Sequence, residues 1–133
     1  MIPTCTDLHV EVIPVSHAEL ASNRPVERSA DIRKRVVAAR EIQKARFANH
    51  YNIFCNAQMT SRMVRQFCVI DEAGQKVLKD AMDRLGLSAR AYDRILKVAR
   101  TIADLDGSLG IGFGHLSEAI NFRSLDRDNW GRK

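Results

Sequence analysis

The stretch "GLSARAYDRILKVARTIADL", residues 86–105, decides the fold, because it has the pattern of one amphipathic helix. Ser88 is a good N-cap for this helix, since a serine hydroxyl can accept a hydrogen bond from a free amide of the first turn. Gly86 follows Leu85 and can adopt the left-handed conformation that commonly ends a helix, so a preceding helix is expected to end here. Apolar residues recur at helical spacing along one side: Ala91, Tyr92, Ile95, Leu96, Ala99, Ile102 and Ala103.

The opposite side of this helix is basic. Arg90, Arg94 and Lys97 fall at i, i+4 and i+7 and share one stripe, and Arg100 lies further along the polar face. Because most surface arginines are solvated, we interpret this face as mostly exposed to water. Arg90 differs because it lies in the first turn, where free amides and the helix dipole attract anions. A guanidinium there can hold a phosphate through two N–H groups.

Further helices are predicted on both sides of residues 86–105. Ser29 is the expected N-cap of a helix that extends to Phe47, with an apolar stripe that includes Ile32 and Val36. Asp71 is the expected N-cap of a helix that ends at Leu85, and residues 62–68 form a short helical segment. The last helix begins at "HLSEAINFR", residues 115–123. Loops are expected at residues 15–28, 49–61 and 106–114.

Residues 7–14, "DLHVEVIP", alternate apolar Leu8, Val10 and Val12 with polar residues. This period of two predicts a strand that ends at a proline. A single strand is not stable in water, and the rest of the chain offers no convincing partner. The segment therefore resembles a piece of a larger sheet.

The expected 29–47 helix is rich in basic residues, which admit two interpretations. Four of them form a possible surface for an anionic partner: Arg33, Lys34, Arg40 and Lys44. The alternative is an ordinary solvated helix face, which is favoured because no aromatic side chains are interleaved to stack on bases. A net charge of +5, from 21 basic and 16 acidic residues, is compatible with either interpretation.

Other chemistry finds little support in the 133 residues. Three dispersed cysteines and four scattered histidines show neither metal-ligand spacing nor a nucleophile and base at an interpretable distance, so no metal site is expected. The glycine-rich loop, residues 106–114, follows a helix rather than a strand and contains no GxxxxGK[ST], which favours a connector over a phosphate loop. No apolar run approaches the roughly 18 residues of a membrane span, and no signal-peptide pattern is seen. A cytoplasmic location is therefore expected.

Three segments resemble a known family: "CNAQM" (55–59), "AMDRLGLSARAYDRILKVARTIADL" (81–105) and "HLSEAINFRSLD" (115–126). They are similar to the C-terminal domain of magnesium-chelatase-related AAA+ ATPases, and most similar to the competence-protein (ComM) branch. "SADIRKRVVAAREIQKARF" (29–47) resembles the helix that opens that domain. The resemblance covers about residues 7–126.

The resemblance implies an all-α fold, a small helical bundle that forms the lid of an AAA+ ATPase core. Residues 1–14 would be a remnant of the last core strand, 15–28 a linker, 29–126 the lid and 127–133 a tail. In the family pattern the arginine of "SAR", here Arg90, is the sensor-2 residue that contacts the γ-phosphate of ATP. Gly86 and Ser88 would support it, and Arg94 and Lys97 share its stripe. ATP and magnesium are the expected cofactors of the full-length protein, the ATPase core and neighbouring subunits of a hexameric ring are the expected partners, and DNA is a possible substrate.

Two departures from the family pattern matter. The segment "IPTCT" has Cys5 where the family carries an arginine that can act on a neighbouring active site. Walker A, Walker B and sensor 1 are absent, so no ATP hydrolysis is expected from this chain alone. A nucleic-acid-binding helical module and a non-catalytic ring-assembly domain stay open as alternatives. The sequence does not distinguish DNA, protein or porphyrin chelation as the parent machine's task.

Overall fold

The structure is a computed structural model that describes residues 7–22 and 24–123. Within these residues every regular element is helical, so the predicted all-α class is confirmed. Cys5 and the predicted tail, residues 127–133, lie outside the described part. The elements run in the order α1 (His17–Leu20), α2 (Ser29–Arg46), the 3-10 turn η1 (Asn56–Gln58), α3 (Ser61–Phe67), α4 (Glu72–Leu85), α5 (Ala89–Leu105) and α6 (Phe113–Asn121).

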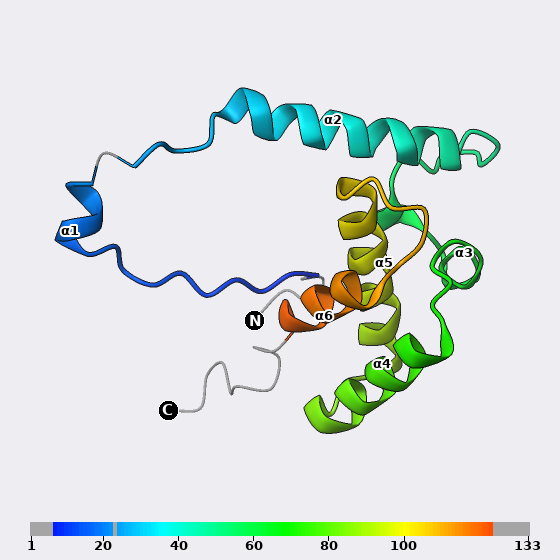
Figure 1. The fold of residues 1–133 in the computed structure, drawn as a ribbon. Coiled ribbons are helices and arrows are strands. Elements are labelled where there is room, and N and C mark those ends of the chain that lie inside the picture. The colour runs from blue at the N-terminus through cyan, green and yellow to red at the C-terminus, as the bar shows by residue number, and fades with distance from the viewer. Residues whose placement is uncertain (1–6, 23, 124–133) are drawn as a thin grey trace.

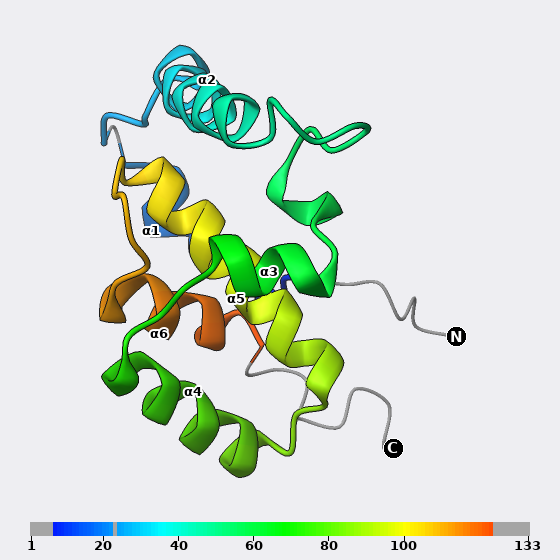
Figure 2. The ribbon, with the colours of Figure 1, turned by 90° about the vertical axis from the view of Figure 1, so that its right-hand side faces the viewer.

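Helix α5 forms the centre of the bundle (Figures 1 and 2). Its predicted apolar face is the one that packs inward, because Ile95 and Ala99 are completely buried and Leu96 nearly so. Helices α2, α3 and α6 all contact α5, and α4 packs against α6. The core that these helices enclose contains Phe47, Met59, Met63, Val64, Cys68, Ile70, Leu78, Ala81, Ile95, Leu96, Ala99, Leu116, Ala119 and Ile120.

The junction between α4 and α5 has the predicted capping residues. Asp71 precedes α4, and its carboxylate accepts a hydrogen bond from the Gly74 amide at 2.7 Å. Gly86 ends α4 with a φ of +61°, a left-handed conformation that L side chains rarely adopt. The next amide, that of Leu87, donates to the carbonyl of Met82 at 3.0 Å, which closes the helix end. The sharp turn places Ser88 directly at the start of α5.

Several predicted boundaries are wrong by one or two residues. Helix α2 already includes Ser29, so Arg28 is the residue at the N-cap and no side chain caps this end. Helix α6 begins at Phe113 rather than at His115, because the His115 ring accepts a hydrogen bond from the Gly112 amide and closes the first turn. The expected loops contain two short turns that the pattern did not reveal, α1 and η1.

The predicted strand over residues 7–14 does not form: this segment is extended but is assigned no strand. Residues 7–22 and 24–123 contain no second strand, and a strand needs a neighbour to form its ladder of hydrogen bonds. Instead, the His9 amide donates a main-chain hydrogen bond to the Phe122 carbonyl at 2.9 Å. We call residues 7–16, which precede α1, the arm.

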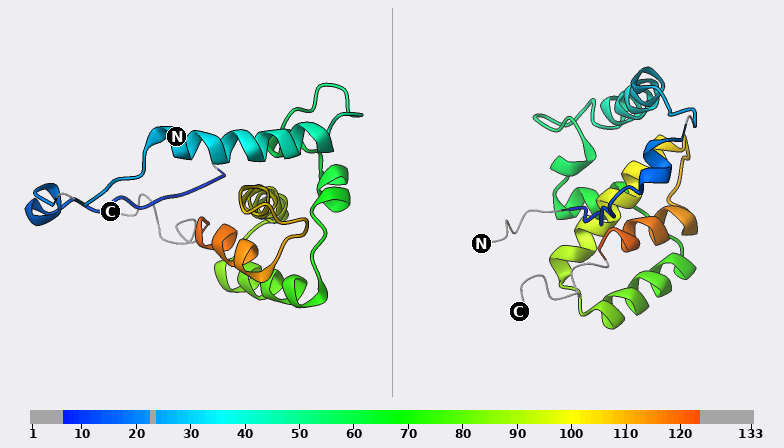
Figure 3. Two further views of the ribbon diagram at one scale, coloured as in Figure 1. Left: turned by 45° about the horizontal axis from the view of Figure 1, so that its top comes forward. Right: turned by 90° about the vertical axis from the view of Figure 1, so that its left-hand side faces the viewer.

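Helix α2 is packed against the bundle along only half of its length (Figures 1 and 3). Ala39, Gln43 and Phe47 on its inner side are buried. Ile32 and Val36 lie at the preceding positions of the same stripe but are 43% and 46% exposed, because α2 extends beyond the end of α5. Among the described residues, no helix has the length and apolar character that a membrane span requires.

Candidate functional site at the start of helix α5

Arg90 is the second residue of α5 and its side chain is exposed. Ser88 caps the helix as predicted, because its hydroxyl accepts a hydrogen bond from the Ala91 amide at 3.4 Å. The first amides of a helix have no carbonyl partner within it, so this end carries partial positive charge. Within residues 7–22 and 24–123, no hydrogen bond or ion pair engages the Arg90 guanidinium. The site therefore presents a free cation beside a positive helix end.

Arg94 and Lys97 do not share this exposure, although they share the stripe. The Arg94 Nε lies 3.2 Å from the Asp7 Oδ1, and its side chain is only 16% exposed. The Lys97 Nζ donates to the carbonyl of Ala57 at 3.1 Å. These two side chains therefore attach other segments to α5, the arm and η1 respectively, and the prediction of a mostly solvated basic face is wrong for them.

Arg100 departs furthest from that prediction, since only 4% of the residue is exposed. Its Nε lies 3.2 Å from the Asp104 carboxylate, whose side chain is completely buried. Arg46 of α2 binds the same carboxylate through two N–H groups, at 2.7 and 2.5 Å. The Asn56 amide donates to Asp104 at 2.8 Å. We call Arg46, Asn56, Arg100 and Asp104 the buried polar network.

This network lowers the pKa of Asp104. Burial alone would raise it, but the hydrogen bonds from Arg46 and Asn56 and the two arginine charges outweigh burial. The nearby Cys68 thiol is affected in the opposite direction: burial raises its pKa to about 11, against smaller contributions from the two arginines. Sequence reasoning missed the network because its members lie up to 58 residues apart. The i, i+4 spacing of Arg100 and Asp104 was the available signal.

The glycine-rich loop connects α5 and α6, as its context predicted, and it is held in place from both ends. Arg100 donates to the carbonyls of Ser108 and Leu109 at 2.8 and 2.9 Å. Gly107 adopts a φ of +68°, and the Ser108 amide returns to the Ala103 carbonyl at 2.8 Å. At the other end the His115 Nε2 lies 3.0 Å from the Asp106 carboxylate. The loop conformation is thus determined by the bundle itself.

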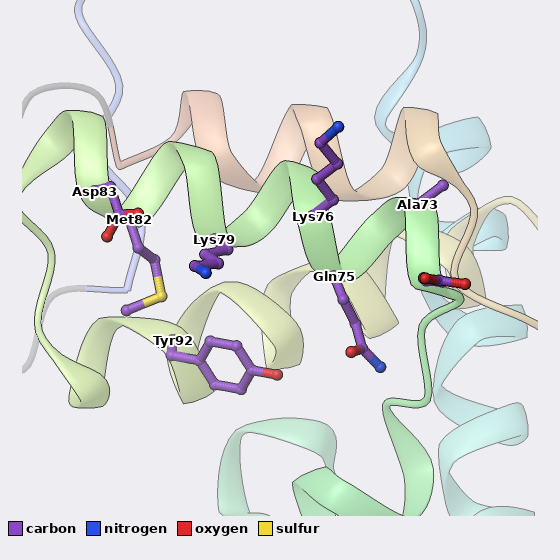
Figure 4. Close-up of a pocket in the computed structure, with 8 residues that line it drawn as sticks. Ala73, Gln75, Lys76, Lys79, Met82, Asp83 and Tyr92 are labelled. Carbon is purple, nitrogen blue, oxygen red and sulfur yellow. The ribbon is translucent and has the colours of Figure 1, made fainter.

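An open groove of about 940 Å³ lies beside α4 and the start of α5. In the close-up, Gln75, Lys79, Met82 and Tyr92 lie between the two helices (Figure 4). The charged residues of the lining are of both signs, with Lys76 and Lys79 against Glu72 and Asp83. This mixture does not favour an anionic or a cationic ligand, so we place the candidate site at Arg90 rather than here.

The four residues of the possible anionic-partner surface are all exposed on α2. Two of them have acidic neighbours: Lys34 lies 3.2 Å from Asp31, and Lys44 lies 3.9 Å from Glu41. Arg33 and Arg40 have no ion pair with another described residue.

For metals, no group of three or more His, Cys, Asp or Glu residues in the described part is placed to hold an ion.

These features define a class of protein: an all-helical domain whose central helix presents a capped, exposed arginine. A family model described as the magnesium chelatase subunit ChlI C-terminal domain matches residues 26–123. The chain therefore belongs to this family.

Relatives with longer chains match the same region. The YifB protein of Escherichia coli is 45% identical over 103 residues, which cover 77% of this chain and 19% of that protein. YifB of Salmonella typhimurium is 42% identical over 101 residues, or 76% of this chain and 19% of the relative. Competence protein ComM of Haemophilus influenzae is 39% identical over 123 residues, which cover 91% of this chain and 23% of that protein. The chain thus spans about a fifth of the length of these relatives.

Proposed function

We propose that this chain is the helical lid of an AAA+ ATPase of the ComM type, and that Arg90 is its sensor-2 arginine. The observation that carries the proposal is the exposed, unpaired Arg90 at the capped start of α5. The chain's membership of the magnesium chelatase C-terminal family supports the same assignment. In this proposal the chain contributes to ATP binding and hydrolysis and to subunit contacts in a ring, but it does not hydrolyse ATP alone.

The start of α5 fits a terminal phosphate in both charge and geometry. The guanidinium can donate two N–H groups to phosphate oxygens, and the helix end adds its dipole. The rest of the nucleotide would lie on the ATPase core, where magnesium neutralises phosphate charge. In this proposal the chain supplies the arginine, and the ATPase core supplies the metal site.

Arg90 would act by stabilising the charge that develops on the γ-phosphate during transfer. Within the described residues the Arg90 side chain forms no ion pair, so no such pair has to break before the arginine binds a phosphate. The core of the bundle and the Ser88 cap hold the helix that carries it. A fixed donor of this kind gives little stabilisation to ADP, because the γ-phosphate is missing.

The test is the nucleotide preference of the longer protein that joins this lid to its ATPase core. We expect Arg90→Ala to weaken binding of a non-hydrolysable ATP analogue at least tenfold while the affinity for ADP changes less than twofold. Arg65→Ala, which removes an exposed arginine from α3, is the matched control and should change neither affinity. Equal losses for both nucleotides, or no loss for the analogue, would contradict the proposal.

A second function is suggested by the basic surface of α2. Arg33, Lys34, Arg40 and Lys44 are exposed on a half-packed helix, so duplex DNA is a candidate ligand for the assembled machine. The chain on its own would then bind DNA weakly at low salt, with an affinity that falls steeply as salt is raised. Charge removal at Arg33 and Arg40 should reduce both the affinity and the salt dependence. Absence of binding at low salt would exclude this function for the isolated chain.

A further inference from the structure

The arm is attached to the bundle near its start. Asp7 forms an ion pair with Arg94 of α5, and two residues later the His9 amide donates to the Phe122 carbonyl beyond α6. Further along, the arm is exposed, including the apolar side chains of Val12 and Ile13. Figure 1 shows the arm leaving the bundle in the direction of α1. Its contacts to the bundle are therefore concentrated at residues 7–9 within the described chain.

The attachment point is close to the candidate phosphate contact. Arg94 follows Arg90 by one helical turn, which places their Cα atoms about 6 Å apart along the axis. The far end of α5, at Leu105, lies about 22 Å from Arg90 by the same rise per residue. If the arm were attached there, a small tilt of the lid would swing Arg90 through a large arc. Attachment at Arg94 keeps that displacement small.

We propose that Arg94 is a positioning residue, which fixes Arg90 relative to the segment that precedes the lid by holding Asp7. The inference rests on the proposed sensor-2 function of Arg90. It assigns the two arginines of one stripe to different tasks: Arg90 contacts the phosphate, and Arg94 determines where Arg90 lies. It also gives the arm a role in regulation, because a shift of the arm moves the start of α5.

The pair is suited to orientation rather than to folding. Half of the Asp7 side chain is exposed, and ion pairs open to solvent contribute little to stability. Substitution of Asp7 should therefore leave the bundle folded, so that its effect on the position of α5 can be measured separately. Exchanging the two charges, Asp7→Arg with Arg94→Asp, keeps an ion pair of reversed polarity and so tests whether the pair itself positions the helix.

The test has two parts. In the isolated chain, Asp7→Asn should increase amide hydrogen exchange at His9 at least fivefold while exchange at Ile95 in the core is unchanged. In the longer protein, Asp7→Asn should lower kcat for ATP three- to tenfold with little change in KM. The double variant Asp7→Arg with Arg94→Asp should recover most of the lost kcat. Glu27→Gln, which removes the carboxylate of an exposed ion pair with Arg35, is the matched control.

The outcomes separate this inference from the proposed function. If Arg90→Ala lowers turnover but Asp7→Asn does not, the positioning role is wrong and the sensor assignment stands. If Arg90→Ala has no effect, the proposed function fails first. Unchanged exchange at His9, or a charge-exchanged double variant that is no better than Asp7→Asn, would each overturn the attachment by this ion pair.

Discussion

Replacing Asp104 by asparagine would remove one negative charge from the buried polar network without a large change in volume. The carboxylate has no exposed side-chain surface, and it accepts hydrogen bonds from Arg46, Asn56 and Arg100. In the variant, Arg46 and Arg100 would lie side by side without a counter-ion. Arg100 would still donate to the loop carbonyls at 108 and 109, which holds it in place.

The expected cost follows from burial. Breaking a buried ion pair by removing one partner costs about 3–5 kcal/mol, because the remaining charge is uncompensated. Arg46 is 13% exposed and regains some hydration, so we expect the lower end, about 3 kcal/mol. A domain of this size has a total stability of about 5–15 kcal/mol, so the variant should stay folded. With a urea m-value of about 1.5 kcal/mol/M, the midpoint should fall by about 2 M.

Urea unfolding of the 133-residue chain, followed by circular dichroism, measures this loss. Asp31→Asn is the matched control, because Asp31 pairs with Lys34 at an exposed position on the same bundle. An exposed pair of this kind contributes about 0.5 kcal/mol, and the first-turn position of Asp31 adds about 0.3–1 kcal/mol through the helix dipole, so the control should lose clearly less than Asp104→Asn. A loss below 1 kcal/mol for Asp104→Asn, or equal losses for both variants, would refute the reasoning from burial.

The pH dependence gives a separate check on Asp104. Its pKa is lowered in the folded state, so its contribution to stability is fully present above its unfolded pKa of about 4. That contribution is lost as the pH falls below this value toward the folded pKa. We expect the free energy of unfolding to fall between pH 5 and pH 3 and to fall less steeply in Asp104→Asn. Parallel pH profiles for the two proteins would contradict the cause assigned to the pKa.

Two further predictions concern single residues. Gly86→Ala should destabilise the chain by about 1 kcal/mol in urea unfolding, because the backbone at this position is left-handed, although the added Cβ would have open space around it. Gly110→Ala, where the added Cβ also has open space, should change the stability less. Burial raises the pKa of the Cys68 thiol to about 11, so Cys68 should react with a thiol reagent at pH 8 far more slowly than the partly exposed Cys55. Equal reaction rates for the two cysteines would contradict this prediction.

Local chemistry made the α4–α5 hairpin predictable from the sequence. Asp71, Gly86 and Ser88 each act on backbone groups within a few residues, and the apolar spacing of α5 depends on helix geometry alone. The position of Arg90 in the first turn followed from the same reasoning. Such features are encoded in short windows of sequence, and the structure confirms them.

Long-range partners were not predictable in this way. Arg100 belongs to the same polar face as the exposed Arg90 in the sequence pattern, yet it is buried, with its guanidinium bound to Asp104 and to the carbonyls of the following loop. The arm has the alternation of a strand, but no other described segment forms a strand beside it. The stripe of α2 predicted burial of Ile32 and Val36, and the helix instead extends beyond α5.

The rate of ATP turnover tests the central claim most directly. In the longer protein that carries this lid on its ATPase core, Arg90→Ala should lower kcat by about a hundredfold or more, because a cationic donor to the transferred phosphate is lost. Arg65→Ala should retain the parent rate. Turnover that is unchanged in Arg90→Ala would contradict the assignment of Arg90 as the sensor-2 arginine.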